Sequence, residues 1–215
     1  MPEGQEERRF NPEPIIAALL ARHVTFVVIG GLAAQYHGSP MLTYDIDVTP
    51  EMSEPNLQRL SDALRDLDAR VRHPDSPEGL PFAYDATSLA AAVCWNLTTR
   101  HGDLDLSFMP AGTRGYHDLA AGAVTITIHG IPFPVASLAD VVRSKDAADR
   151  PKDHRALPVL RELLAQQRET ARQPKQPKQR QEPEQRQEPE QRRRRGGAPA
   201  ARPGQPAGGG RASSR

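Results

Sequence analysis

The stretch FVVIGGLAAQYHGSPMLTYDIDVTP, residues 26–50, constrains the fold most, because it places two strand patterns on either side of a glycine pair. The apolar run Phe26–Ile29 predicts a buried strand, and Gly30 and Gly31 end it and open a short helix. The first N–H groups of such a helix are unpaired, and glycine lets an anion approach the backbone closely. The pair therefore indicates a phosphate-binding turn, although ordinary tight turns also use Gly-Gly.

Two aspartates alternate with apolar residues in the second strand pattern, Asp45-Ile46-Asp47-Val48. Residues i and i+2 of a strand point to the same face, so Asp45 and Asp47 are expected to project together while their neighbours enter the core. Adjacent carboxylates repel each other, and a divalent cation relieves that repulsion. The alternative is a solvent-facing strand end without a metal.

A later strand pattern, GDLDLSF at residues 102–108, offers a third carboxylate. Asp105 is flanked by leucines, so it is expected to face outward from a core strand that neighbours the first. Asp103 shares this face, but we expect it to serve as a turn residue beside the hairpin loop. The sequence thus predicts a cluster of Asp45, Asp47 and Asp105.

The remainder of residues 11–170 alternates between helix and strand patterns. This order predicts an α/β (α+β) fold in which helices flank a small mixed sheet. Helices are expected at residues 14–23, 31–37, 53–67, 87–93 and, as one helix or two, 137–167; strands are expected at 24–29 and 44–50, with hairpins at 95–108 and 124–136.

Composition divides the chain near residue 170. The sequence is 37% apolar, below the usual figure of roughly 45–50%, and the deficit lies in residues 171–215. Residues 1–170 carry 16 Lys/Arg and 23 Asp/Glu, a net −7, whereas residues 171–215 carry 12 and 4, a net +8, which together give the +1 of the chain. We expect a flexible N-terminus at 1–10, one folded domain at 11–170 and a disordered, basic tail at 171–215.

The predicted tail contains the hexapeptide QRQEPE twice in tandem, at residues 179–190. The repeat has no apolar residue to bury, so it is low-complexity sequence. The run that follows suits contact with the phosphates of RNA without reading its sequence. It consists of Arg192, Arg193, Arg194 and Arg195. A solvated tail, or a tail that associates with the acidic domain, is the alternative.

Cys94, the only cysteine, lies in the apolar run LAAAVCW and is expected to be a buried structural thiol. A single cysteine excludes an intramolecular disulfide and fits a reducing compartment. No apolar run approaches the roughly 20 residues of a membrane span, and the histidines lack zinc-ligand spacing. We therefore expect a cytoplasmic protein without a membrane segment or a zinc site.

The glycine pair, the gap of 13 residues, the Asp-apolar-Asp-apolar strand and the later aspartate strand together resemble the nucleotidyltransferase fold of the DNA polymerase β superfamily. Within it, residues 30–48 and SLADVVRSKDAADRPKD, residues 137–153, resemble bacterial AbiEii-like and minimal nucleotidyltransferases, several of which belong to toxin–antitoxin pairs. The resemblance covers about residues 24–164.

This resemblance implies transfer of a nucleoside monophosphate from an NTP to a hydroxyl group of RNA, tRNA, protein or a small molecule. It implies two Mg²⁺ ions, with Mn²⁺ as a substitute, bound by Asp45, Asp47 and Asp105. The resemblance also implies that Lys145 contacts the nucleotide phosphates; the alternative is that it is an ordinary exposed lysine of a helix. The positions that match phosphate-facing ones are Gly30, Gly31 and Lys145. The turn that follows Lys145 supplies Arg150, Lys152 and Asp153, and the candidate hydroxyl donors are Ser39 and Thr43.

Two residues depart from the family pattern. Met41 stands where relatives often have arginine, and Tyr44 stands where they have a charged residue. Three classes of function therefore stay open: an active nucleotidyltransferase, a catalytically weak nucleotide- or nucleic-acid-binding module, and an antitoxin-like partner of another protein. The three retained aspartates favour the first.

Overall fold

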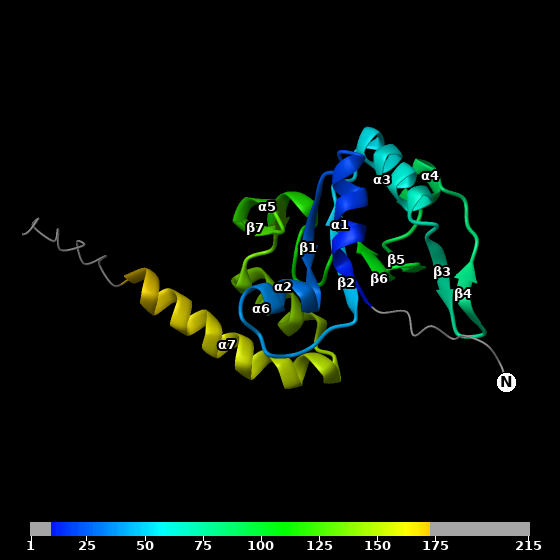
Figure 1. The fold of residues 1–215 in the computed structure, drawn as a ribbon. Coiled ribbons are helices and arrows are strands. Elements are labelled where there is room, and N and C mark those ends of the chain that lie inside the picture. Colours follow the sequence, from blue (N-terminus) through cyan, green and yellow to red (C-terminus); the bar gives the residue numbers. More distant parts are fainter. Residues whose placement is uncertain (1–9, 173–215) are drawn as a thin grey trace, which may run out of the picture. The chain divides into compact units, whose positions relative to one another are not determined.

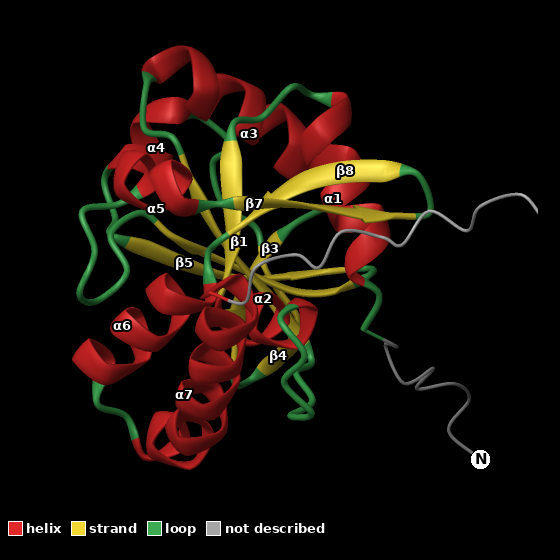
Figure 2. Cartoon of the chain, turned by 90° about the vertical axis from the view of Figure 1, so that its left-hand side faces the viewer, coloured by secondary structure: helices red, strands yellow, loops and turns green. Residues whose placement is uncertain are grey.

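The computed structural model describes residues 10–172, which form an eight-stranded mixed sheet with helices on both sides of it (Figure 1, Figure 2). Nearly all of the predicted N-terminal segment and of the predicted tail, including its arginine run, lie outside the described residues. None of the described helices is both long and apolar enough to cross a membrane.

Helices and strands alternate along the described chain, and the expected elements occur in the predicted order with three further ones between them. The helices are α1 (Pro12–Ala21), α2 (Gly30–Tyr36), α3 (Glu54–Asp66), α4 (Ala86–Ala90), α5 (Tyr116–Gly122), α6 (Leu138–Ala148) and α7 (Pro151–Arg172). The strands are β1 (Phe26–Ile29), β2 (Asp45–Pro50), β3 (Arg70–His73), β4 (Ser76–Leu80), β5 (Cys94–Thr99), β6 (Gly102–Ser107), β7 (Val124–Ile128) and β8 (Ile131–Val135).

The sheet has the strand order β4-β3-β5-β6-β2-β1-β8-β7. At its centre, β2 pairs antiparallel with β1 and parallel with β6. The end of β1 therefore lies beside the first residues of β2 and β6. Because the glycine pair directly follows β1 and the aspartates begin β2 and β6, this topology gathers the predicted site at one edge of the sheet.

Alternation along β2 and β6 separates the core from the site. Ile46, Val48, Leu104 and Leu106 are fully buried, whereas the aspartates between them are only partly buried. Burial of such side chains contributes on the order of 2 kcal/mol each to folding, so a register slip that exposed them would be strongly disfavoured. The predicted fold class, a mixed sheet flanked by helices, is confirmed.

The closing region contains two helices, which settles the alternative that the sequence left open. Asp149 has a left-handed backbone with φ of 50° and ends α6, and Pro151 opens α7, where its missing N–H costs no hydrogen bond. Figure 2 shows α2, α6 and α7 grouped on one side of the strands, with α3 and α4 on the other. Lys145, Arg150 and Lys152, on either side of the α6–α7 break, line the same cavity as the aspartates.

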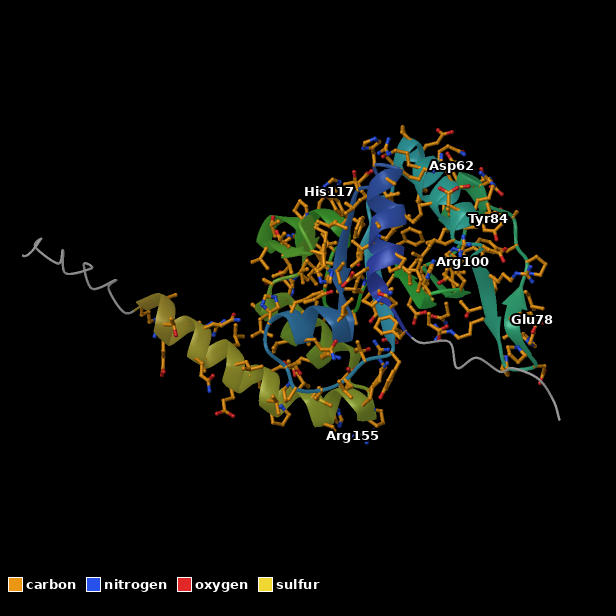
Figure 3. All side chains as sticks on the ribbon, in the orientation of Figure 1. Asp62, Glu78, Tyr84, Arg100, His117 and Arg155 are labelled. Atoms are coloured by element: carbon orange, nitrogen blue, oxygen red, sulfur yellow. The ribbon has the colours of Figure 1, made fainter. Side chains whose placement is uncertain are left out.

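Three elements have no counterpart among the expected ones: the hairpin of β3 and β4, and helix α5. The hairpin sequence RVRHPDSPEGL is polar, is interrupted by two prolines and has little apolar alternation, as is usual at a sheet edge. Glu78 lies on this hairpin, and Arg155 projects from the outer side of α7 (Figure 3). The hairpin extends the sheet beyond β5 and brings one of its arginines to the site.

Candidate functional site

The parallel register of β2 and β6 places four aspartates on one face of the sheet. Asp45 lies opposite Asp103, and Asp47 lies opposite Asp105. Among the described residues, carboxylate oxygens of Asp45, Asp47 and Asp105 lie within 4.8 Å of one another. We call these three residues the carboxylate cluster. The structure therefore brings together the three side chains that the sequence singles out.

The electrostatics of the carboxylate cluster disfavour its fully ionised form in the absence of a cation. Burial raises the pKa of Asp47, the charge of Asp45 raises it further, and Lys152 and Lys145 lower it. Burial also raises the pKa of Asp105 to about 6, against the opposing effect of Arg72. Three oxygen donors with this mutual repulsion suit a hard divalent cation such as Mg²⁺.

The glycine pair packs directly against two side chains of the site. Gly30 has φ of +67°, and a Cβ atom there would lie 1.9 Å from Oδ2 of Asp47. At Gly31, a Cβ atom would lie 2.7 Å from Oγ1 of Thr43, and the backbone N–H of Gly31 lowers the pKa of Asp47. Both positions thus need glycine, because any larger residue would clash with Asp47 or Thr43. This structural requirement is separate from the predicted phosphate contact.

The two candidate hydroxyl donors already have partners. The hydroxyl of Thr43 donates to Asp45, so it orients a carboxylate of the cluster. The hydroxyl oxygen of Ser39 accepts a hydrogen bond of 3.3 Å from the backbone N–H of Met41, which shapes the loop between α2 and β2. Both residues line the cavity beside the cluster.

The break between α6 and α7 supplies the cations of the site. Lys145 donates a 2.9 Å hydrogen bond to Asp153, which is 1% exposed, and Arg150 lies 3.3 Å from the other oxygen of Asp153. Lys152 is exposed and makes no ion pair with any described residue. We call Lys145, Arg150 and Lys152 the helical wall. Of the three, Lys152 is the one without a carboxylate partner.

Arg72 of β3 is a site residue that the sequence does not reveal. One guanidinium nitrogen lies 2.8 Å from Asp103, and the other contacts Asp105. The expectation that Asp103 is a turn residue is therefore wrong. Asp103 belongs to strand β6, and it anchors Arg72 beside the cluster. Because Arg72 lies in a polar hairpin 33 residues away from Asp105, no local pattern could have linked the two.

The carboxylate cluster lines a cavity of about 540 Å³ that also contains the glycine pair and the helical wall. Cys94 lines this cavity and is exposed, so the expectation of a buried structural thiol is wrong. The reason is that α4 ends at Ala90 and Cys94 begins β5 on the face that carries Asp105. An apolar neighbourhood in sequence did not determine which face the residue occupies.

No protein-family model matches the sequence, and no curated protein matches it either. Solved structures that resemble the chain are nucleotidyltransferases. The lincosamide antibiotic adenylyltransferase LnuA, with lincomycin bound, is 14% identical, with a TM-score of 0.48 over 72% of this chain and 99% of that one. A putative nucleotidyltransferase from Thermotoga maritima is 17% identical, with a TM-score of 0.45 over 76% of this chain and 99% of that one.

A third similar structure is ANT(2'')-Ia in complex with adenylyl-2''-tobramycin. It is 20% identical, with a TM-score of 0.43 over 74% of this chain and 90% of that one. All three likenesses are distant in sequence and in backbone arrangement. The geometry of the site itself must therefore carry any functional assignment.

Proposed function

We propose that this protein is a metal-dependent nucleotidyltransferase that moves a nucleoside monophosphate from an NTP to a hydroxyl acceptor. The observation that carries the proposal is the carboxylate cluster, which shares one cavity with the cations of the helical wall. Carboxylates that can hold metal ions beside cations that can hold phosphates are the two components that phosphoryl transfer requires. No covalent protein nucleophile is needed.

The donor set fits Mg²⁺, with Mn²⁺ as a substitute, because the three carboxylates supply closely spaced oxygen ligands. Asp45 and Asp47 would hold two ions, with Asp105 as a further ligand. Bound ions would neutralise charge on the triphosphate and lower the pKa of the acceptor hydroxyl. Thr43 and the N–H of Gly31 each face one carboxylate of the β2 pair, so both restrict how these ligands can turn.

Asp105 is the proposed proton acceptor. As the acceptor oxygen attacks the α-phosphorus, a new O–P bond forms and the bond from the α-phosphorus to the bridging oxygen breaks. Pyrophosphate leaves with that electron pair, and the hydroxyl proton passes to the Asp105 carboxylate. Burial raises the pKa of Asp105 to about 6 in the metal-free site, so the carboxylate is ionised at neutral pH and able to accept that proton.

The helical wall is the proposed binding site for the triphosphate. Lys152 is the first candidate, because it is exposed, makes no ion pair with the described residues and is close enough to lower the pKa of Asp47. Lys145 and Arg150 share Asp153, so they contribute positive charge from fixed positions. The backbone at Gly30 and Gly31 is the second proposed phosphate contact.

Met41 supports a second candidate, a nucleotide-binding module with little turnover. Its side chain lines the cavity without a charge, so one cation that relatives often place there is missing. The AbiEii-like relationship, a cognate toxin or antitoxin partner, and RNA binding by the arginine run of the tail are finer proposals that rest on the sequence resemblance alone. Identity of the adjacent gene and co-purification of its product would address the toxin–antitoxin proposal.

The test is incubation of the protein with each of the four α-³²P-labelled NTPs and Mg²⁺, with bulk RNA, lysate protein or a small-molecule extract as acceptor. We expect label in one acceptor fraction, stoichiometric pyrophosphate, and neither product with EDTA or with Asp47→Asn. Mg²⁺-dependent NTP binding without pyrophosphate in any fraction would instead identify the binding module.

A further inference from the structure

We infer that the acceptor is an uncharged small molecule that carries a hydroxyl group and an apolar portion, and that it binds against the strands β5 and β6. This inference rests on the proposed function and specifies the acceptor of that reaction. It is carried by the distribution of charge around the cavity. The two sides of the carboxylate cluster differ in the ligands that they can hold.

Positive charge in the cavity lies on one side only. Among the described residues that line it, the lysine and arginine side chains are those of the helical wall, which belong to α6, to α7 and to the turn between them. A triphosphate with several negative charges would bind there. The acceptor must then approach the α-phosphorus from another direction, which the strands provide.

The surface above Asp105 continues its face of the sheet with uncharged side chains. Asn96 is the direct partner of Asp105 in the β5–β6 register, and Cys94 is the partner of Ser107. Met109 follows just beyond β6 and also lines the cavity. We call Cys94, Asn96, Ser107 and Met109 the strand wall. It offers an amide, a hydroxyl and a thiol to a polar acceptor, and no formal charge.

An apolar rim accompanies the strand wall. Met109 is 62% exposed and Leu42, on the loop before β2, is 76% exposed, and both line the cavity together with Met41. Exposed large apolar side chains that gather around one cavity are characteristic of a ligand site. They would favour an acceptor with a hydrocarbon or ring surface over a fully hydrated one.

A nucleic acid acceptor would need cations along its backbone, and the strand wall supplies none. Arg72 of β3 reaches Asp105 from the strand side, but its guanidinium is engaged by both Asp103 and Asp105. The absence of lysine and arginine from the strand wall therefore favours a small neutral acceptor over a polymer with a phosphate backbone.

The natural cysteine provides the test, because Cys94 is the only thiol in the chain and lies on the strand wall. Its rate of reaction with Ellman's reagent would be measured on the full-length protein with Mg²⁺ and, in turn, the α,β-methylene analogue of each of the four NTPs. Three probes would then be added: n-octyl β-D-glucoside below its micelle concentration, the oligoribonucleotide A10, and the cationic sugar glucosamine. Calorimetry would record analogue binding in parallel.

We expect octyl glucoside to slow the thiol reaction at least threefold, and neither A10 nor glucosamine to change it. Protection by A10 or glucosamine, or by none of the three, would overturn the inference about the acceptor. The proposed function is judged separately, because its failure would show as an absence of Mg²⁺-dependent analogue binding in the calorimeter. The two failures are therefore distinguishable.

A variant pair tests the apolar contact. Met109→Asp should raise the octyl glucoside concentration that gives half-maximal protection about tenfold, because it replaces an apolar contact with a charged carboxylate, and should leave analogue binding unchanged. The control is Met52→Asp, which alters an exposed methionine that does not line the cavity. Equal loss of protection in both variants would contradict a specific contact with Met109.

Discussion

The helical wall and the strand wall meet at the same carboxylate cluster, yet they are built in different ways. The helical wall depends on a helix break at Asp149 and on a buried ion pair between Lys145 and Asp153. The strand wall follows from the register of β5 with β6, which turns Asn96 to the face of Asp105. Positive charge in the cavity is thus concentrated where two helices meet, while the strand wall presents neutral groups.

This difference indicates how one small domain can handle two dissimilar substrates. A triphosphate needs cations that are fixed in place, and Lys145 is held by its 2.9 Å hydrogen bond to the buried carboxylate of Asp153. An acceptor needs a surface that can vary without loss of the fold. Side chains on the outward face of a strand meet that need, since their neighbours Leu104 and Leu106 hold the core.

The largest expected effect comes from the cluster that both walls share. Asp47→Asn should reduce transfer at least about 100-fold, since loss of even a supporting group at a metal site commonly costs 10–100-fold. Its melting temperature in EDTA should stay equal or rise, because burial and Asp45 both raise the pKa of Asp47 and the substitution removes that charge. Asp62→Asn on α3 (Figure 3) is the control. Turnover near that of the control would refute the metal assignment.

The glycine turn should show the next largest effect. Gly30→Ala places a Cβ atom 1.9 Å from the Asp47 carboxylate, so we expect destabilisation by about 2–4 kcal/mol from strain and overpacking and at least tenfold weaker Mn²⁺ binding. Gly130→Ala is the matched control, because Gly130 also has positive φ but has nothing within 4 Å. Denaturant titration and Mn²⁺ titration of both variants measure the difference, and similar losses would show that backbone strain alone explains it.

Sequence alone could predict the centre of this site but not its walls. Asp45 and Asp47 are two residues apart on a strand whose alternation is visible locally, and the glycine pair marks the end of the preceding strand. Their shared face follows from backbone geometry. The fold class follows from the same local patterns.

The parts that sequence could not predict depend on contacts between distant elements. Arg72 reaches Asp105 only because β3 pairs with β5, and the prolines and charges of its hairpin conceal that strand. Cys94 was misplaced because the end of α4 and the start of β5, not the surrounding apolar run, determine its face. The apolar neighbours of Cys94 indicated a buried side chain, whereas the pairing of β5 with β6 places it on the exposed face.

Asp105 gives the metal-free protein a specific pH dependence. Its folded-state pKa is about 6, above its ordinary value of 3.8, so its favourable contribution is present below pH 4 and is lost as the pH rises through 6. At 1.36 kcal/mol per pKa unit, the loss is about 2–3 kcal/mol. Denaturation in EDTA at pH 4 and pH 7 should show this decrease in the wild type, and Asp105→Asn should show a smaller one, because burial and Asp45 also raise the pKa of Asp47. Equal decreases in both proteins would contradict the assignment.

The two walls should differ in which Michaelis constant they set. Lys152→Gln should raise the KM for NTP about tenfold, because a hydrogen bond to a charged group is worth roughly 1.5–3 kcal/mol, and should leave the KM for the acceptor unchanged. Arg155→Gln is the control, since Arg155 projects from the outer side of α7 (Figure 3). A rise in both KM values for Lys152→Gln would mean that the walls do not bind separate substrates.

The smallest effect is expected from removal of the tail, residues 173–215. That sequence contains no large apolar residue, so the melting temperature of the 1–172 protein should lie within a few degrees of the full-length value. A neutral acceptor makes no phosphate contacts, so its KM and the salt dependence of that KM should also be unchanged.

If the arginine run recruits RNA, deletion should instead raise the acceptor KM and flatten its salt dependence, and the inference from the strand wall would then be wrong. If the tail screens the acidic domain, deletion should increase activity at low salt only. Acceptor KM values for both proteins at two salt concentrations separate these outcomes, because each one changes a different combination of the four measurements.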